Sequence, residues 1–173
     1  RIADAPPKTN LPLVAPISID GRSLRRLEVH TYLHDPSMAP EGRTVILVRF
    51  EGDYGYWTKL RADKKQYSEE KERVLKETIR ALEERYPGIS SRTEARDVAT
   101  PSSCERYTGN WKGSSQGWVL TVELMKRNFS GAKLPKTFPG VDCFHLIGQW
   151  VEPGGGLPIA AREGRDVVNA IGR

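Results

Sequence analysis

The sequence predicts an α+β fold, in which a mixed or antiparallel sheet is covered by helices and a strand–turn–helix unit closes the chain. Three stretches support this prediction. Residues 44–50 form an apolar, β-branched run that is typical of a strand. Residues 68–86 carry apolar side chains at helical spacing. The apolar run at 144–148 leads through a glycine-rich turn into a second helical stretch at 157–171.

The first part of the chain predicts strands. Prolines are frequent in residues 1–20 and favour an extended connector with a short edge strand at 13–19. Asp20-Gly21 marks a turn. The β-branched and aromatic side chains of residues 24–33 then predict a second strand.

A loop with two prolines at 34–42 separates this strand from residues 44–50. Because residues 44–50 are apolar on both faces, we expect their strand to lie centrally in the sheet. The aromatic and glycine-rich residues 51–57 are expected to form another loop.

A long helix is expected from Ser68 to Tyr86. Ser68 can cap its start, and the acidic residues that follow suit the first helical turn. Pro87-Gly88 ends it. The predicted buried stripe consists of Leu75, Ile79, Leu82 and Tyr86.

The second half of the chain is less regular. Residues 89–98 favour a strand, whereas 102–142 predict long loops with one short helix at most. Residues 144–148 are expected to form a short buried strand. We therefore predict a partial sheet-and-helix domain at 1–142 and a strand–helix unit of a neighbouring sheet at 143–173.

The composition is that of an ordinary soluble protein, with 173 residues, 38% hydrophobic and 28% charged residues and a net charge of +5. Acidic residues interrupt the basic ones throughout, which favours a solvated surface over a nucleic-acid-binding stripe. Cys104 and Cys143 lie far apart, and the three histidines form no helical metal pair. We expect reduced thiols, no metal site and a cytoplasmic protein.

The glycine-rich turn, Pro153-Gly154-Gly155-Gly156, is the first candidate ligand site. Backbone N–H groups at a helix start carry partial positive charge and lack partners inside the helix, so they suit a phosphate or another electron-rich group. A plain turn is the alternative. Three consecutive glycines cost backbone entropy on folding, however, and a plain turn needs only one.

A second cluster, residues 100–113, is dense in hydrogen-bonding side chains. It shows no Ser–His–Asp order and no paired carboxylates, so both a surface loop and a ligand-covering loop fit it. The sequence also lacks the G-x-G-x-x-G, P-loop and H-E-x-x-H motifs. It therefore does not predict a complete nucleotide site.

Two segments together resemble the phytoene desaturase and carotenoid isomerase family of amine-oxidase-like flavoproteins. Residues 97–101 with 105–118, which contain Glu-Arg-Tyr-Thr-Gly-Asn-Trp-Lys-Gly-Ser, resemble the family's middle signature. Residues 146–158, with Gly164-Arg165, resemble its C-terminal flavin motif. The loop at 34–42 is also similar to a family loop. The resemblance covers most of residues 30–173.

The resemblance implies that the chain is the C-terminal part of a larger FAD-dependent oxidoreductase, whose dinucleotide fingerprint lies upstream of Arg1. Residues 1–142 would then belong to the substrate-side domain. Residues 143–173 would supply the returning strand and helix of the FAD-binding domain.

The family motif also implies which residues face FAD. Gly148 and Gln149 would lie near the ribityl–pyrophosphate part of FAD. Gln149 stands where many relatives have an acidic residue, so its contact would be uncharged. The residues expected to approach the isoalloxazine ring are Gly154, Gly155, Gly156 and Leu157.

The implied reaction is hydride exchange between an apolar, polyene-like substrate and the flavin, with the protein positioning the reactants and excluding water. Arg106 and Tyr107 are the candidate substrate-binding residues. No catalytic residue and no direction of reaction are assigned, and peripheral membrane association of the longer protein stays open.

Two other functions stay open. The missing fingerprint favours a binding or interaction module that holds no flavin by itself, and the net charge of +5 motivates an anion-binding or nucleic-acid-binding domain. We expect the isolated chain to be inactive and to bind FAD weakly or not at all. We also expect it to expose apolar surface and to associate with itself.

Overall fold

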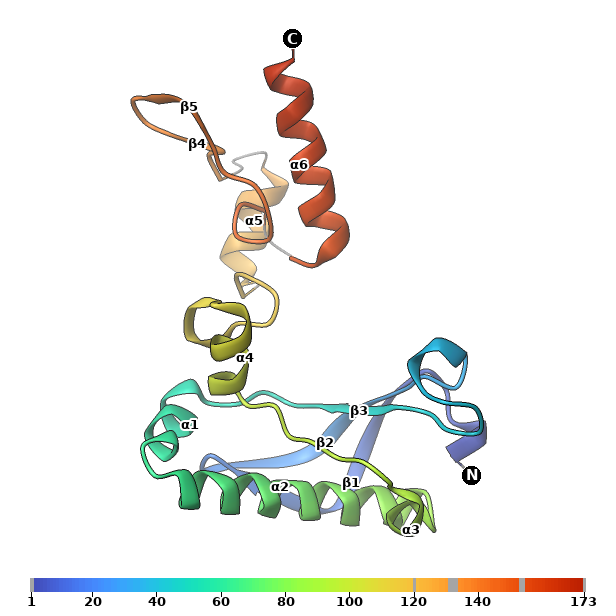
Figure 1. The fold of residues 1–173 in the computed structure, drawn as a ribbon. Coiled ribbons are helices and arrows are strands. Elements are labelled where there is room, and N and C mark those ends of the chain that lie inside the picture. The colour runs from blue at the N-terminus through green and yellow to red at the C-terminus, as the bar shows by residue number, and fades with distance from the viewer. Residues whose placement is uncertain (1, 120, 131–133, 153–154, 173) are drawn as a thin grey trace. The chain divides into compact units, whose positions relative to one another are not determined.

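The computed structural model describes residues 2–119, 121–130, 134–152 and 155–172. It confirms the α+β class, with small antiparallel sheets and helices (Figure 1). The chain divides into two compact units, Arg1–Ser103 and Cys104–Arg173. The assignment of residues 143–173 to a FAD-binding domain stays a prediction.

The first unit is built on an antiparallel sheet. After a 3-10 turn, η1 (Ile2–Asp4), the strands β1 (Lys8–Ile19), β2 (Arg22–Thr31) and β3 (Ile46–Arg49) pair in the order β1–β2–β3. Asp20 and Gly21 form the predicted turn between β1 and β2. Their φ angles are +49° and +79°, as the tight turn of a two-residue hairpin requires.

The edge strand β1 is longer than predicted. Its register against β2 shifts between Pro12 and Ile17, so Pro16 lies in an irregular segment within the strand. Proline cannot donate to a neighbouring strand, and edge strands and bulges are the places that tolerate it.

The prediction that residues 44–50 form a central strand is wrong, because β2 is the central strand and β3 lies at an edge of the described sheet. Ile46 and Val48 are half-buried, whereas Leu47 is 42% exposed. Although residues 44–50 are apolar on both faces, only one face of β3 therefore packs on the core. The loop before β3 contains a short turn, η2 (Pro36–Met38).

Two helices follow β3. Residues 51–57 were expected to form a loop, but α1 (Tyr54–Arg61) begins there because the Asp53 carboxylate accepts from Tyr56 N–H at 2.6 Å. The long helix α2 (Lys64–Arg85) begins earlier than predicted, since Asp63, and not Ser68, caps it.

The helix α2 packs against β1 and closes the core of the first unit (Figure 1). Leu82 and Tyr86 are buried as predicted, but Leu75 and Ile79 are only half-buried, since Val74 and Thr78 occupy the face toward the core. The buried core consists of Leu11, Ile17, Ile19, Leu27, Val29, Trp57, Val74, Ala81, Leu82, Tyr86 and Ile89.

The strand expected at 89–98 is absent from the described structure. Instead, α3 (Ile89–Arg92) follows α2 directly, and the Glu83 carboxylate accepts from the N–H groups of Gly88 and Ser90. The next helix, α4 (Pro101–Thr108), begins at a proline, and Thr100 Oγ1 accepts from Ser103 N–H at 3.2 Å.

The second unit contains more regular structure than expected. Besides η3 (Trp111–Gly113), it holds α5 (Val122–Phe129) and the hairpin of β4 (Thr137–Phe138) and β5 (Val141–His145). The prediction of long loops with one helix at most is therefore wrong. The predicted buried strand at 144–148 is also corrected: β5 ends at His145, and Phe144 is 49% exposed.

The last helix, α6 (Leu157–Ile171), has the predicted bounds. In the described part of the second unit, Val151, Val167 and Glu163 are buried, whereas many apolar side chains are exposed. None of the helices in the described ranges is both long and apolar enough to cross a bilayer. The exposed apolar residues are Tyr107, Trp111, Trp118, Val119, Val122, Met125, Phe129, Phe138, Val141, Phe144, Ile147, Leu157, Val168 and Ile171.

Candidate functional site

The candidate site centres on the turn between β5 and α6. We call its described residues, 148–152 and 155–156, the glycine turn. Val151 N–H donates to the carbonyl of Gly148 at 3.2 Å and closes the first part of the turn. Gly148, Gly155 and Gly156 have φ angles of +101°, +55° and +88°. All three therefore adopt backbone conformations that side chains disfavour.

Two of these glycines border open space. Among the described residues, no atom lies within 4 Å of a Cβ added at Gly148, and at Gly156 only Pro158 Cδ does, at 3.9 Å. A ligand can therefore approach the bare backbone at both positions. This arrangement fits the flavin motif that the sequence resembles.

The start of α6 adds electrostatic character to the turn. Gly156 is the N-cap residue and has no side chain that could accept from the first N–H groups of the helix. Such N–H groups attract electron density. Leu157, at the first helical position, is 87% exposed.

Residues 110–118, which follow α4, form a second ordered element that we call the positioning loop. Asn110 Nδ2 donates to the carbonyl of Ser114 at 3.0 Å, and Ser114 Oγ donates to the carbonyl of Gly117 at 2.7 Å. These hydrogen bonds fold the loop back on itself. The cluster predicted at 100–113 thus consists of α4 and the first part of this loop.

Side chains join the positioning loop to the glycine turn. Gln149 Nε2 donates to Asn110 Oδ1 at 3.2 Å, and the Trp118 indole N–H donates to the carbonyl of Trp150 at 2.7 Å. The rings of Trp118 and Trp150 meet edge to face, with centroids 5.2 Å apart.

The backbones of the two segments also approach each other closely. A Cβ added at Gly117 would lie 2.4 Å from the carbonyl oxygen of Gln149, and one added at Gly155 would lie 2.0 Å from that of Gln116. Both distances are far below van der Waals contact. Glycine at 117 and 155 is therefore required by packing as well as by φ.

The predicted site residues divide into groups. Gly148, Gln149, Gly155, Gly156 and Leu157 lie in or beside the glycine turn, and Gly154 lies outside the described residues. Arg106 and Tyr107 lie at the exposed end of α4, where the guanidinium carbon of Arg106 is 5.5 Å from the centroid of the Tyr107 ring. Their role toward a substrate stays a prediction.

Charged side chains hold α6 against its neighbours in the second unit. Glu163 is 1% exposed, and its Oε2 lies 2.6 Å from Lys136 Nζ. Arg162 forms an ion pair with Glu152, which links the helix to the residue that follows Val151. At the exposed face, a hydrogen bond from Arg165 lowers the pKa of Asp166.

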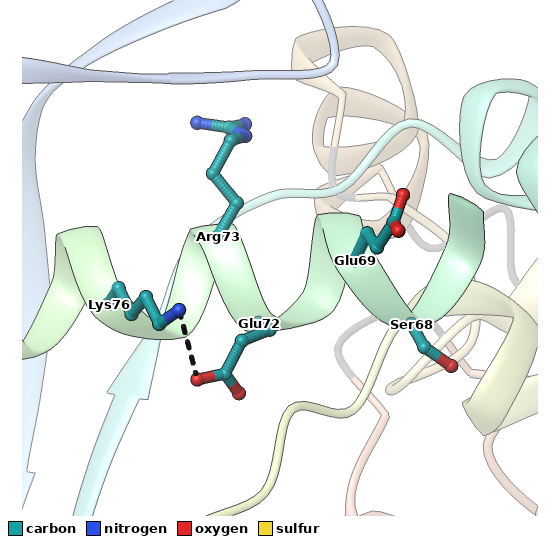
Figure 2. Close-up of a pocket in the computed structure, with 5 residues that line it drawn as sticks. All are labelled: Ser68, Glu69, Glu72, Arg73 and Lys76. Carbon is teal, nitrogen blue, oxygen red and sulfur yellow. Dashed lines mark ion pairs between the residues drawn. The ribbon is translucent and has the colours of Figure 1, made fainter. Parts of the chain in front are cut away.

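We find no comparable candidate site elsewhere in the described residues. The described ranges hold no group of three His, Cys, Asp or Glu side chains suited to a metal ion, and both cysteines are free thiols. A surface depression of about 420 Å³ lies on α2 in the first unit, and Figure 2 shows the residues that line it. It contains none of the predicted site residues, and its lining residues are Ser68, Glu69, Glu72, Arg73 and Lys76.

Comparison with known proteins supports the family resemblance predicted from the sequence. The chain is 31% identical over 143 residues to 4,4'-diaponeurosporene oxygenase of Staphylococcus haemolyticus, an alignment that covers 83% of this chain and 27% of that protein. The chain is therefore similar to about a quarter of that protein. The predicted family resemblance is thereby confirmed for the chain as a whole.

Two plant relatives extend the comparison. The chain is 29% identical to the chloroplastic prolycopene isomerase of Arabidopsis thaliana and 27% identical to that of Daucus carota. Each alignment covers 80% of this chain but only 22% and 21% of those proteins. The chain thus spans about a quarter of the length of these relatives. No family model and no solved structure matches it.

Sequence reasoning missed the residues that join the two motifs. Gly117, Trp118 and Asn110 were read as parts of a family signature, and Trp150 as part of another, without a contact between them. A signal existed: glycine at 117 and three glycines near 155 mark close backbone approach. Glu163 was also missed, although it shares a helix face with Val167 four residues later.

Proposed function

We propose that this chain is the C-terminal part of a FAD-dependent oxidoreductase that acts on an apolar, carotenoid-type substrate. One observation carries most weight: Gly148 and Gly156 present bare backbone to open space at the two ends of the glycine turn that leads into α6, within a motif that resembles a flavin motif. The relatives named for neurosporene-type and lycopene-type compounds support the substrate class.

In this proposal, the glycine turn contacts one side of the cofactor. Gly148 and Gly156 would allow close approach, and the partial positive charge of the α6 N–H groups would favour the electron-rich, reduced form of a bound flavin. The exposed Leu157 side chain would offer the ring an apolar surface. When bound, FAD would accept or donate the hydride.

The protein's own contribution is to orient the reactants and to exclude water. Arg106 and Tyr107 expose a cationic group and an aromatic ring on α4, and Tyr107 is 81% exposed. We propose that they border the substrate. A polyene offers no charge to an arginine, so Tyr107 would supply the larger share of the contact.

The deciding experiment uses the longer protein that contains this chain. Its gene should encode a G-x-G-x-x-G fingerprint before Arg1, and the purified protein should bind FAD with visible absorbance. The 173-residue chain alone should bind FAD much more weakly, because it lacks half of the site. A longer protein without the fingerprint and without bound flavin would refute the proposal.

The same measurement of FAD binding distinguishes the proposed oxidoreductase from an interaction module that holds no flavin. The many exposed apolar side chains of the second unit favour a surface that contacts other polypeptide. In an interaction module, flavin would bind neither to the chain nor to the longer protein, and deletion of the glycine turn would leave partner binding unchanged.

A further inference from the structure

We infer that the positioning loop fixes the conformation of the glycine turn. Gly155 and Gln149 contact the positioning loop, whereas Gly148 and Gly156 face the ligand. The inference deepens the proposed function and rests on it for the nature of the ligand. It divides the residues of the flavin motif into positioning residues and ligand-facing residues.

The contact between the two segments is reciprocal. The positioning loop supplies Gly117, which faces the Gln149 carbonyl of the turn, and the turn supplies Gly155, which faces the Gln116 carbonyl of the loop. In each case the two nearest opposing atoms belong to the backbone and not to a flexible side chain. A side chain at either glycine must therefore displace one segment from the other.

Two hydrogen bonds fix the register of this contact. The Asn110–Gln149 bond holds the turn at its second residue, and the Trp118–Trp150 bond holds it at the third. The two hydrogen bonds lie on either side of the Gln149–Trp150 peptide, whose carbonyl faces Gly117. The Gly148–Val151 hydrogen bond, which closes the turn, lies directly around them.

This arrangement leaves a clear division of roles. The Gln149 amide is hydrogen-bonded to Asn110, and Gly155 is covered by the Gln116 backbone. Gly148 and Gly156 border open space among the described residues. The loop therefore acts on a ligand through the turn, and Gly117, Trp118 and Asn110 are positioning residues.

The test compares Gly117→Ala with Gly140→Ala in the 173-residue chain. Both glycines have a φ of +78°, but a Cβ added at Gly140 meets no described atom within 4 Å. Both variants therefore place an alanine at a positive φ, but only Gly117→Ala brings a Cβ into collision with the Gln149 backbone. Gly117→Ala should accelerate hydrogen exchange of the Val151 amide and of the Trp118 indole N–H at least tenfold, and Gly140→Ala less than twofold.

Trp118→Phe provides a second variant in case Gly117→Ala does not fold. It keeps an aromatic ring beside Trp150 but removes the donor, and it should accelerate exchange of the Val151 amide about threefold. Equal exchange in Gly117→Ala and Gly140→Ala, or an unprotected Val151 amide in the unaltered chain, would overturn the inference.

The longer protein then links the contact to the ligand. Gly117→Ala should weaken FAD binding at least tenfold, and Gly140→Ala less than twofold. Faster exchange with unchanged FAD binding would overturn the positioning role. If the unaltered longer protein binds no FAD, the proposed function fails, while exchange of Val151 still decides whether the loop fixes the turn.

Discussion

Glu83 shows how one carboxylate connects two helices. Its oxygens accept hydrogen bonds from Gly88 N–H at 2.6 Å, from Ser90 N–H at 2.8 Å and from the Ser90 hydroxyl at 2.7 Å. These bonds, those from Ser90 and Gly88 N–H above all, lower the pKa of Glu83 from 4.5 to about 2. The negative charge is therefore stabilised in the folded state.

The sign of this shift predicts how stability depends on pH. A folded-state pKa below the ordinary value contributes stability above about pH 4.5, and this contribution is lost as the pH falls toward 2. Glu83→Gln should lower the melting temperature at pH 7 and flatten its fall between pH 5 and pH 2. Thermal unfolding followed by circular dichroism measures both effects.

Glu84→Gln is the matched control for this change. Glu84 accepts from Arg80 at the surface, at 2.9 Å, and holds no backbone N–H in the structure as described. It should change the melting temperature much less. An equal loss in both variants would mean that Glu83 acts only as a surface charge.

The buried Glu163 leads to a second prediction at this scale. Lys136 Nζ lies 2.6 Å from Glu163 Oε2, although this contact lacks the geometry of an aligned hydrogen bond among the described residues. We take the close approach of opposite charges as the stabilising interaction. Lys136→Met should cost about 3 kcal/mol in unfolding free energy, because it leaves a buried carboxylate without its counter-charge.

The double variant Lys136→Met/Glu163→Met tests the cause. With both charges removed, much of the lost stability should return, since a buried ion pair can be replaced by apolar side chains at little cost. Urea unfolding followed by tryptophan fluorescence measures the difference. A double variant as unstable as Lys136→Met would contradict this account.

At the scale of elements, the start of α2 is decided by Asp63. Its carboxylate accepts from the N–H groups of Lys65 and Gln66 at 2.9 and 3.2 Å. Asp63→Ala should therefore lower the unfolding free energy by about 1 kcal/mol. Ser68→Ala, at the start predicted from the sequence, replaces an exposed residue inside the helix and should leave the unfolding free energy unchanged or raise it slightly. Chemical denaturation of the two variants compares them, and a larger loss for Ser68→Ala would contradict the observed cap.

The sequence predicted elements that carry a strong local signal. The α6 bounds, the Asp20-Gly21 turn and the end of α2 follow from apolar spacing, glycine and proline. It failed for α1 and α5, since helices of eight residues show too few turns for a clear period. It failed for α3 because the carboxylate of Glu83 comes from a neighbouring helix.

The candidate site was predictable in part for the same reason. The glycines at 148 and 154–156 lie together in the sequence, so their cluster was visible. The partner of Gly155 is the Gln116 carbonyl, 39 residues earlier, and nothing local reveals such a contact. The family resemblance named both segments but did not pair them.

At the scale of the whole chain, the two units differ in how much apolar surface they bury. The buried core cluster lies entirely within residues 11–89, whereas most of the large exposed apolar side chains lie in residues 104–173. A soluble protein rarely exposes so many apolar side chains without a partner surface. We therefore expect the second unit to pack against another polypeptide surface.

This difference predicts concentration-dependent association of the isolated chain. Light scattering should show a mass above 19.4 kDa that rises with concentration. A chain that ends after Gly109 lacks most of the exposed apolar side chains and should stay monomeric. The full 173-residue chain remaining monomeric at high concentration would contradict the prediction.

The two edges of the sheet in the first unit are unequal. Along β1, Pro12 and Pro16 offer no N–H, and the register shift between Pro12 and Ile17 bends the edge. The other edge, β3, contains no proline and exposes Leu47. The sheet can therefore grow in one direction only. A strand from another segment or another chain would therefore pair more readily beside β3 than beside β1.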